Sequence, residues 1–261
     1  MNKQPTFVLA LLILTLFSCG ETTEDTPLIK PELLSIKRTY SHGYENTTTF
    51  EYQAGRLIKK SLQGLGSGTI DNVYTYENGV LSSMEVFASN GDRLNRHEYS
   101  LDADGTKREK VYINQSGSMV LVSEFELIKV AGNEARLNLY SYVSGTREAV
   151  DYRTMTLSDG NVLRQESFLW DGTSYGVVEE WQRHEGLDPL KGFFGDVDFG
   201  IHGHDMSQNL HSYNVTKRDG EKVKEETNII TLNEFGLPSQ VEVVLQLSGT
   251  EQRYTDSYIY K

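Results

Sequence analysis

Cysteine is almost absent from this sequence of 261 residues. Cys19 is its one cysteine, so no disulfide can form within the chain. Proline is scarce too, with five residues, and no apolar run approaches the roughly 20 residues that a membrane-spanning helix needs. These shortages exclude a disulfide-stapled fold and leave one apolar run to explain, the 11 residues Phe7–Phe17.

Positive charge is the next shortage. The chain has 25 Lys and Arg against 37 Asp and Glu, which gives a formal net charge of −12. Removal of residues 1–18 would take away one lysine and leave −12 minus 1, or −13. A phosphate-backbone partner needs clustered Lys and Arg, so we do not expect nucleic acid binding. The acidic surface favours solubility, and binding of a cationic ligand is the alternative.

The N-terminal residues have the pattern of a lipoprotein signal. Phe7–Phe17 has the length of a signal-peptide core and leads directly into Ser18 and Cys19. Leu16, three residues before the cysteine, and Ser18 resemble the bacterial lipoprotein box. We therefore predict that residues 1–18 are a lipoprotein signal peptide that is removed, and that Cys19 carries acyl chains such as palmitate as a membrane anchor. An ordinary secretory signal with a chance cysteine is the alternative.

Residues 19–33 are predicted to be the lipidated cysteine and a disordered tether, because they are polar and lack hydrophobic periodicity. The acidic residues Glu21, Glu24 and Asp25 resemble the signal that sends Bacteroidota lipoproteins to the cell surface. A solvated acidic linker explains them as well. We therefore expect an outer-membrane lipid anchor, with the cell surface and the periplasmic face both open.

The stretch Val73–Phe87 has the pattern of a β-hairpin. Asn78-Gly79 fits a two-residue turn in which both residues have φ > 0. The flanks are rich in Tyr, Thr, Val and Leu, which suit a pleated sheet. The cross-strand pairs predicted from this closure are Tyr76–Leu81, Tyr74–Ser83, Val73–Met84 and Thr75–Ser82. They would give the hairpin one aromatic and one aliphatic face.

Weaker copies of this hairpin run through the chain. Glycines recur every 11 to 15 residues from Gly55 to Gly186, many of them after Asn, Asp or Ser. An aromatic or apolar pair at alternate positions precedes every second turn: Phe50/Tyr52, Tyr74/Tyr76, Tyr99/Leu101, Phe125/Leu127, Met155/Leu157 and Ile230/Leu232. The repeat unit is therefore a hairpin of about 26 residues, and a fixed period indicates a repetitive fold.

Two of the copies resemble a known repeat. Phe50–Leu57 and Tyr74–Leu81 are similar to the YD repeats of RHS-type proteins, and the chain resembles uncharacterised Bacteroidota lipoproteins that carry such repeats. In those proteins an Asn-Pro or Asp-Pro step precedes a variable loop, and Asp188-Pro189 lies at that place here. The resemblance covers most of residues 34–261 and implies a fold and an envelope location, but no activity.

The fold predicted for residues 34–261 is all-β, a single large curved antiparallel meander sheet of about 14 to 16 strands. Open sheets rarely pass about ten strands without curling, so we expect a half-barrel or open-barrel form. One irregular loop insertion is expected near residues 187–209, where the hairpin rhythm stops. A membrane-spanning barrel is not expected, because Thr106–Ile113 places charges on both faces of one strand, and a lipid-facing charge costs about 2–4 kcal/mol near the midplane.

The irregular loop contains the candidate metal site of the sequence. His202, His204, Asp205 and His211 are potential ligands, and His-x-His on an extended segment directs both rings to one side, as zinc or copper requires. The spacing matches no named metal motif, and a solvated polar loop is the alternative. We predict no cofactor.

Three functions remain open. No nucleophile motif is present, so the question of enzymatic activity stays open and we place first a non-enzymatic binding or interaction module for a glycan or another envelope component. The first alternative is a periplasmic carrier of an apolar ligand in a concave sheet face. It depends on whether the Tyr, Phe and Leu face stays open or is plugged by Leu187–Asn209. The second alternative is a metal-dependent enzyme that uses His202 and His204.

Overall fold

The computed structural model describes residues 31–64, 68–191, 207 and 209–261, and the regular elements of this part are sixteen β-strands. They are β1 (Leu33–Tyr40), β2 (Glu45–Gln53), β3 (Arg56–Gln63), β4 (Thr69–Glu77), β5 (Val80–Phe87), β6 (Arg93–Leu101), β7 (Lys107–Gln115), β8 (Ser118–Lys129), β9 (Glu134–Val143), β10 (Thr146–Ser158), β11 (Asn161–Leu169), β12 (Ser174–Leu187), β13 (Asn209–Arg218), β14 (Glu221–Leu232), β15 (Pro238–Leu247) and β16 (Thr250–Tyr260). No helix among the described residues is long and apolar enough to cross a membrane. The predicted all-β meander is confirmed, and most of the irregular insertion predicted near residues 187–209 lies outside the described residues.

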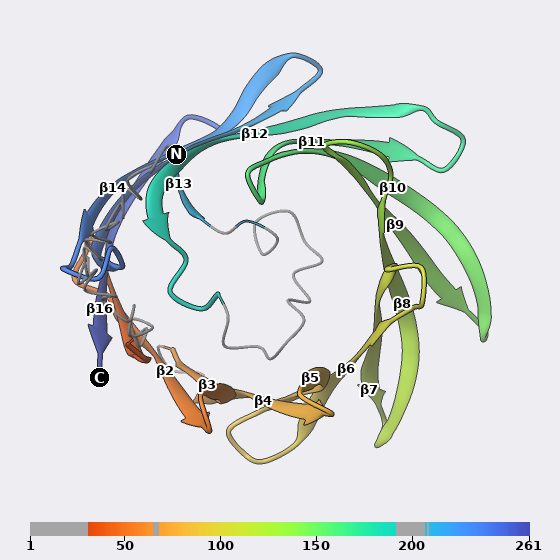
Figure 1. Ribbon diagram of the computed structural model, residues 1–261, viewed down its shortest axis with the longest axis horizontal. Coiled ribbons are helices and arrows are strands. Elements are labelled where there is room, and N and C mark those ends of the chain that lie inside the picture. The colour runs from red at the N-terminus through yellow and green to blue at the C-terminus, as the bar shows by residue number, and fades with distance from the viewer. Residues whose placement is uncertain (1–30, 65–67, 192–206, 208) are drawn as a thin grey trace, which may run out of the picture. The chain divides into compact units, whose positions relative to one another are not determined.

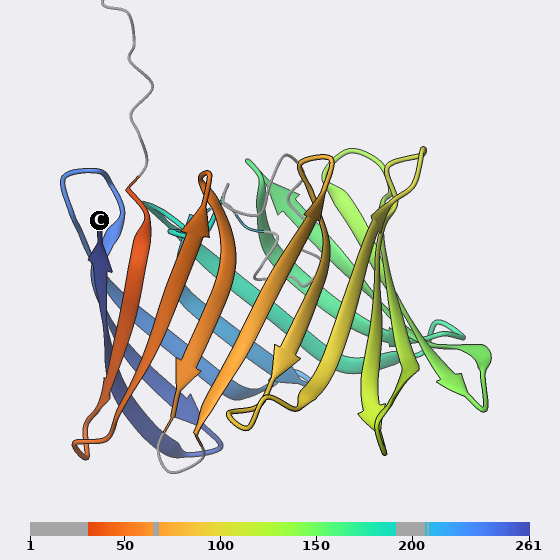
Figure 2. The same cartoon turned by 90° about the horizontal axis from the view of Figure 1, so that it is seen from below.

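The sixteen strands form one closed antiparallel barrel (Figures 1 and 2). Each strand pairs with its neighbours in the chain, and β1 also pairs with β16, from Leu33–Tyr260 to Tyr40–Tyr254. The predicted half-barrel or open-barrel form is therefore wrong. Turn signals specify only neighbouring strands, whereas closure depends on the first and last strands, whose pairing removes both sheet edges.

The hairpin at Asn78-Gly79 has the predicted turn, with φ of 50° and 85°. Tyr76 pairs with Leu81 as expected, but the register then shifts by one, so that Tyr74 faces Met84. The other three predicted pairs are wrong because a β-bulge inserts an extra residue beside the turn. The bulge places both tyrosines on the same face as Leu81 and Met84, so the predicted separation into an aromatic and an aliphatic face does not occur.

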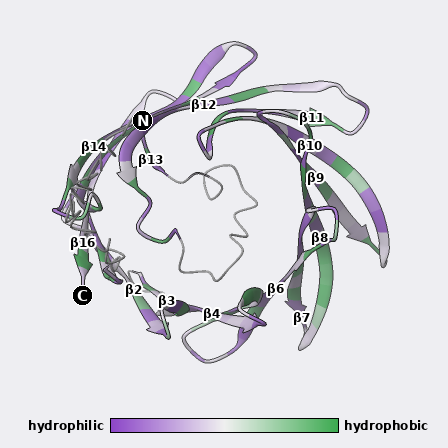
Figure 3. Cartoon of the chain, viewed as in Figure 1, coloured by the Kyte–Doolittle hydropathy of each residue, from purple (hydrophilic) through white to green (hydrophobic). Residues whose placement is uncertain are grey.

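Cross-strand pairs define two continuous faces of the barrel wall, and hydrophobic and hydrophilic residues alternate along the strands between them (Figure 3). One face contains the rows Phe50, Lys60, Asn72, Val86, Asn95, Ile113 and Val120, and Met155, Gln165, Glu179, Thr216, Lys224 and Leu247. The aromatic and apolar pairs that precede alternate turns lie on this same face.

This face is the inside of the barrel. The segment after β12, Asp188–Lys191, turns into the ring of strands (Figure 1), and Leu190 packs against Leu33, Phe50 and Leu57 of β1–β3. Because β12 lies several strands away from β1 around the ring, this contact crosses the enclosed space. We call this the inner face, and the face formed by the alternate residues the outer face.

The two ends of the barrel differ in how the inner face is packed. The end that carries the β12–β13 connection and the start of β1 holds two buried clusters: Leu33, Phe50 and Leu57, and Leu127, Ala135, Leu137, Met155 and Val162. We call it the packed end. At the opposite end, inner-face side chains remain exposed: Leu62 (38%), Ile70 (39%), Val120 (38%) and Leu247 (46%). We call this end, formed by the turns that follow odd-numbered strands, the rim.

Candidate functional site: the inner face of the barrel

The inner face is the candidate site because of the size of the barrel. Side chains fill the interior of an eight-stranded barrel, whereas sixteen-stranded barrels enclose a space that their own wall cannot fill. Leu62 and Ile70, which pair directly across β3 and β4, are 38% and 39% exposed, so the wall at the rim keeps apolar surface open to solvent. The inner face can therefore contact a ligand.

Tyrosines form one section of this wall. The members are Tyr40, Tyr52, Tyr74, Tyr76, Tyr254, Tyr258 and Tyr260, on β1, β2, β4 and β16. Burial raises the pKa of Tyr76 and of Tyr254 to about 12, so both are neutral at physiological pH. The hydroxyl of Tyr76 donates to the carbonyl of Leu57 at 2.7 Å, and that of Tyr260 donates to the carbonyl of Pro238 at 2.7 Å. These tyrosines therefore form an aromatic section of the wall, in which Tyr76 and Tyr260 are bonded to the barrel itself.

Arg38 and Asp256 form a charge pair on the inner face where β1 meets β16. Nε and Nη2 of Arg38 donate to the two carboxylate oxygens of Asp256, each at 2.7 Å. The guanidinium carbon lies 3.9 Å from the ring centre of Tyr254. Burial lowers the pKa of Arg38, but the hydrogen bonds and charge of Asp256 outweigh burial and raise it overall. Arg38 thus stays charged, and its two hydrogen bonds to Asp256 tie the closing strands together.

His211, Lys224 and Glu226 form a second polar group, on β13 and β14. Nε2 of His211 lies 2.7 Å from Oε1 of Glu226, and Nζ of Lys224 lies 3.2 Å from Oε2. Burial would raise the pKa of Glu226, but the hydrogen bond from His211 and the charges of His211 and Lys224 lower it to about 2. Glu226 is therefore a carboxylate at every pH at which the protein would work.

The metal site predicted from the sequence includes this His211, whose imidazole is paired with Glu226. The other candidates, His202, His204 and Asp205, lie outside the described residues. Across residues 31–64, 68–191, 207 and 209–261, no three His, Cys, Asp or Glu side chains are grouped to hold a metal ion. The metal site stays a prediction from the sequence.

The low pKa of Glu226 predicts a pH-dependent contribution to stability. A carboxylate whose pKa falls from 4.5 to about 2 on folding stabilises the protein above pH 4.5 and loses this effect as the pH falls toward 2. Glu226→Gln should therefore lower the free energy of unfolding by up to about 3 kcal/mol at pH 7, and the difference from wild type should close by about pH 2. Urea unfolding across this pH range measures it. Glu225→Gln, at the next residue on the outer face, is the control, and an equal effect there would contradict the assignment.

The described ends of the β12–β13 connection are fastened to the wall at the packed end. The backbone N–H of Val162 donates to Oγ of Ser207 at 3.0 Å, and Ser207 is 1% exposed. Nη2 of Arg183 donates to the carbonyl of Val162 at 2.6 Å, and the N–H of Asn209 donates to Oδ1 of Asn161 at 2.9 Å. The connection thus leaves and rejoins the barrel beside the β10–β11 turn.

The outer face carries many ion pairs. Cross-strand pairs include Lys59–Asp71 at 3.0 Å, Arg93–Glu85 at 2.5 Å and Lys217–Glu180 at 2.7 Å. One outer row reads Glu51, Lys59, Val73, Glu85, Arg96 and Tyr112. Charged residues therefore follow the outside of the wall from strand to strand.

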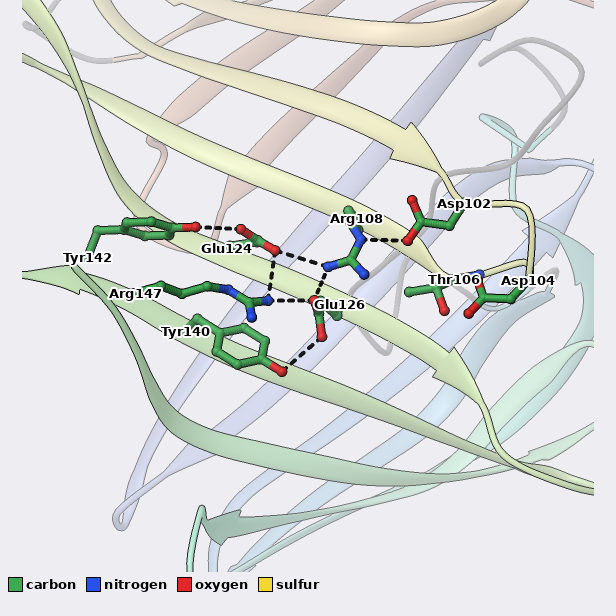
Figure 4. A network of polar contacts seen from close by, with 9 residues as sticks. All are labelled: Asp102, Asp104, Thr106, Arg108, Glu124, Glu126, Tyr140, Tyr142 and Arg147. Carbon is green, nitrogen blue, oxygen red and sulfur yellow. Dashed lines mark hydrogen bonds and ion pairs between the residues drawn. The ribbon is translucent and has the colours of Figure 1, made fainter. Parts of the chain in front are cut away.

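The outer face of β7–β10 also holds two buried carboxylates (Figure 4). The side chains of Glu124 and Glu126 are 5% and 9% exposed. Arg108 and Arg147 each contact both carboxylates; Nη2 of Arg147 lies 2.8 Å from Glu124 and 2.5 Å from Glu126. Burial would raise the pKa of Glu124, but the hydrogen bond from Tyr142 and the charge of Arg147 lower it. The group is a satisfied charge network within the wall.

Comparison with known proteins reveals a similarity in fold alone. No protein-family model matches the chain, and no curated protein does. A porin-like protein from Bacteroides vulgatus has a similar structure, with 10% sequence identity, 88% of this chain and 99% of that chain covered, and a TM-score of 0.52. A porin-like protein from Bacteroides uniformis aligns at 13% identity over 88% of this chain and 96% of that chain, with a TM-score of 0.38. The first of these likenesses shows a common barrel fold.

The sequence analysis did not predict several residues of this site. The exposed inner-face residues Leu62, Ile70, Val120 and Leu247 had no signal beyond strand alternation, and bulges beside the turns change which alternate set faces inward. The network of Glu124 and Glu126 did leave a signal, since two glutamates at alternate positions lie in an otherwise apolar strand. The repeated pairs such as Phe50/Tyr52 were found correctly as one face of the sheet.

Proposed function

We propose that this chain is a non-enzymatic protein of the cell envelope, held to the outer membrane through lipid on Cys19, whose barrel interior binds an apolar or amphipathic ligand. The observation that supports it is the division of residues between the two faces. The inner face holds the two buried apolar clusters, the tyrosines and the exposed Leu62, Ile70 and Val120, set between polar residues, whereas ion pairs run along the outer face.

This division is the reverse of the one a membrane-spanning barrel needs. Such barrels present an apolar band to lipid and a polar interior. Here the outer row that contains Glu51, Lys59, Glu85 and Arg96 would face lipid, and each charge at the midplane would cost about 2–4 kcal/mol. The likeness to a porin-like structure supports the barrel, and the outer face favours a barrel that stands in water beside the membrane.

Ligand binding would remove the exposed inner surface from water. Burial of apolar area contributes roughly 25 cal/mol per Å², and the exposed side chains at the rim lie on inner-face rows that continue into the tyrosine section. The packed end carries the buried clusters, one of which has Leu57 packed against Leu190. A ligand would therefore enter from the rim, with its apolar part along the inner face.

A matched pair of variants tests this proposal. The purified full-length protein should bind a fluorescent naphthylamine probe saturably, with emission rising as the probe leaves water. Leu62→Asp/Ile70→Asp should weaken the affinity at least tenfold, because two facing charges replace apolar contacts on the inner face. Gln63→Asp, one residue along and on the outer face, should bind as wild type does. Absent saturable binding by wild type, or equal affinity in the inner-face variant, would refute the proposal.

A further inference from the structure

The rim carries exposed apolar side chains around nearly all of its circumference. Seven of its eight turns have one within the turn or beside it. They are Tyr44 (47% exposed), Ile70 (39%), Leu94 (39%), Val120 (38%), Val143 (54%), Trp170 (41%) and Leu247 (46%). The exception is the charged β13–β14 turn, Arg218–Glu221. Neighbouring turns lie about 10 Å apart, two strand spacings, so these side chains form a nearly continuous ring.

The packed end has a different surface. It also exposes apolar residues, among them Leu101, Val130 and Phe235. Apart from Leu101, the apolar inner-face side chains that form the two clusters here are buried, and charged turns such as Asp102–Asp104 lie beside the exposed residues. At the rim, the exposed ring continues directly into the exposed inner face. Three rim turns are uncharged Ser-Gly pairs, Ser116-Gly117, Ser144-Gly145 and Ser248-Gly249.

We propose that the rim docks on the surface of a phospholipid bilayer, so that an acyl chain can pass between the membrane and the inner face without crossing water. This rests on the proposed function and names its ligand class, a membrane amphiphile. Tyr and Trp favour the membrane–water interface, where Tyr44 and Trp170 would lie. The ring also suits shallow apolar insertion at the headgroup level, because ion pairs such as Lys59–Asp71 and Lys217–Glu180 on the outer face would stay in water.

The segment that follows the predicted lipid anchor is long enough for the rim to reach the membrane. The chain from Cys19 to Pro31 spans at most about 40 Å, whatever its path. A strand of nine residues is about 30 Å long and is tilted in a barrel, so the barrel is shorter than this reach. The rim can therefore touch the membrane that holds the lipid, and it can equally touch a facing membrane.

The two tryptophans of the chain provide separate reporters for docking and for ligand binding. Trp170 lies at the rim, in contact with Tyr140 and Tyr152 on the outer face. Trp181 lies on the inner face against the cluster that contains Leu127 and Met155. Trp181→Phe leaves Trp170 as the single tryptophan, and Trp170→Phe leaves Trp181.

The experiment places full-length protein with each single tryptophan in phosphatidylethanolamine–phosphatidylglycerol vesicles that contain phosphatidylcholine brominated on its acyl chains. Protein-free vesicles of the same composition are added in excess, so that either membrane can be touched. Bromine quenches tryptophan on contact. We expect Trp170 to lose at least half of its emission relative to unbrominated vesicles. Val143→Asp/Leu247→Asp should abolish this quenching, and Thr156→Asp, exposed on the outer face near the packed end, should not.

The outcomes separate the two proposals. Quenching of Trp170 that the rim variant abolishes supports docking, and quenching of Trp181 in addition supports entry of phospholipid into the barrel. Quenching of Trp181 alone would overturn rim docking while leaving ligand binding intact. Unquenched Trp170 with a dimer in sedimentation would assign the rim to a second copy of the chain, and unquenched Trp170 in a monomer would equally overturn the proposal. Circular dichroism of each variant confirms that the barrel is folded.

Discussion

Leu57→Ala should lower the free energy of unfolding by about 2–5 kcal/mol, one of the largest effects we expect from a single substitution. Leu57 is 0% exposed and packs in the cluster with Leu33 and Phe50 at the packed end. Its removal leaves a cavity that a β-barrel wall, held by its hydrogen bonds on both sides, cannot close. Equilibrium urea unfolding followed by circular dichroism measures the change, and thermal unfolding should show a midpoint lower by about 2–4 °C for each kcal/mol.

Leu62→Ala is the matched control for this prediction. It makes the same chemical change on the same strand and the same inner face, but Leu62 is 38% exposed at the rim. We expect a loss of less than about 1 kcal/mol, because little buried contact disappears. Equal losses at the two positions would mean that the rim is packed as tightly as the opposite end, which would also remove the basis for a ligand-binding interior.

The second large effect is expected in the network of β7–β10. Arg108→Met/Arg147→Met should destabilise the protein by about 3–5 kcal/mol, because it leaves Glu124 and Glu126 buried without the two guanidinium groups that contact them. The two carboxylates would then repel each other in a site that excludes water. Urea unfolding at pH 7 measures the loss, and it should shrink at low pH, where the carboxylates take up protons.

Restoring charge balance provides the control. Adding Glu124→Gln/Glu126→Gln to the double arginine variant should recover most of the lost stability, since uncharged amides need no cation. If the fourfold variant is as unstable as the double one, the arginines act through packing of their long side chains and not through charge. In that case the loss of stability in the double variant, relative to wild type, would not shrink at low pH.

The strands, the turns and the shared faces of the fold could be predicted from local sequence patterns. Asn78-Gly79 and its relatives predicted the turns, and pairs such as Phe50/Tyr52 predicted which residues share a face, because turn conformation and strand alternation are local properties. Closure and register did not follow. The Tyr74–Met84 pairing depends on a bulge whose position the side chains do not reveal, and the Arg38–Asp256 pair joins residues 218 positions apart.

The candidate site was harder to predict for a related reason. A face is inner or outer only once the sheet has closed, so Tyr52, Tyr74 and Tyr76 could be recognised as members of repeated pairs but not assigned to an interior. The sequence-based search for a site selected His202 and His204. It did not select Leu62 and Ile70, which have polar neighbours in the sequence. Single exposed leucines of this kind are common on any protein surface, and only their shared position makes them informative.

The pairing of β1 with β16 sets a condition on the order of events during biosynthesis. Hairpins such as Val73–Phe87 can form as soon as they emerge, since their contacts are local. The pairing that closes the barrel cannot form so early, because it joins β1 to the eleven-residue final strand β16, Thr250–Tyr260. Until those residues are released, the growing chain exposes two unpaired strand edges, which invite association with other chains. A chain truncated before Thr250 would keep those edges permanently, so loss of the final strand should lead to aggregation and not to a smaller barrel.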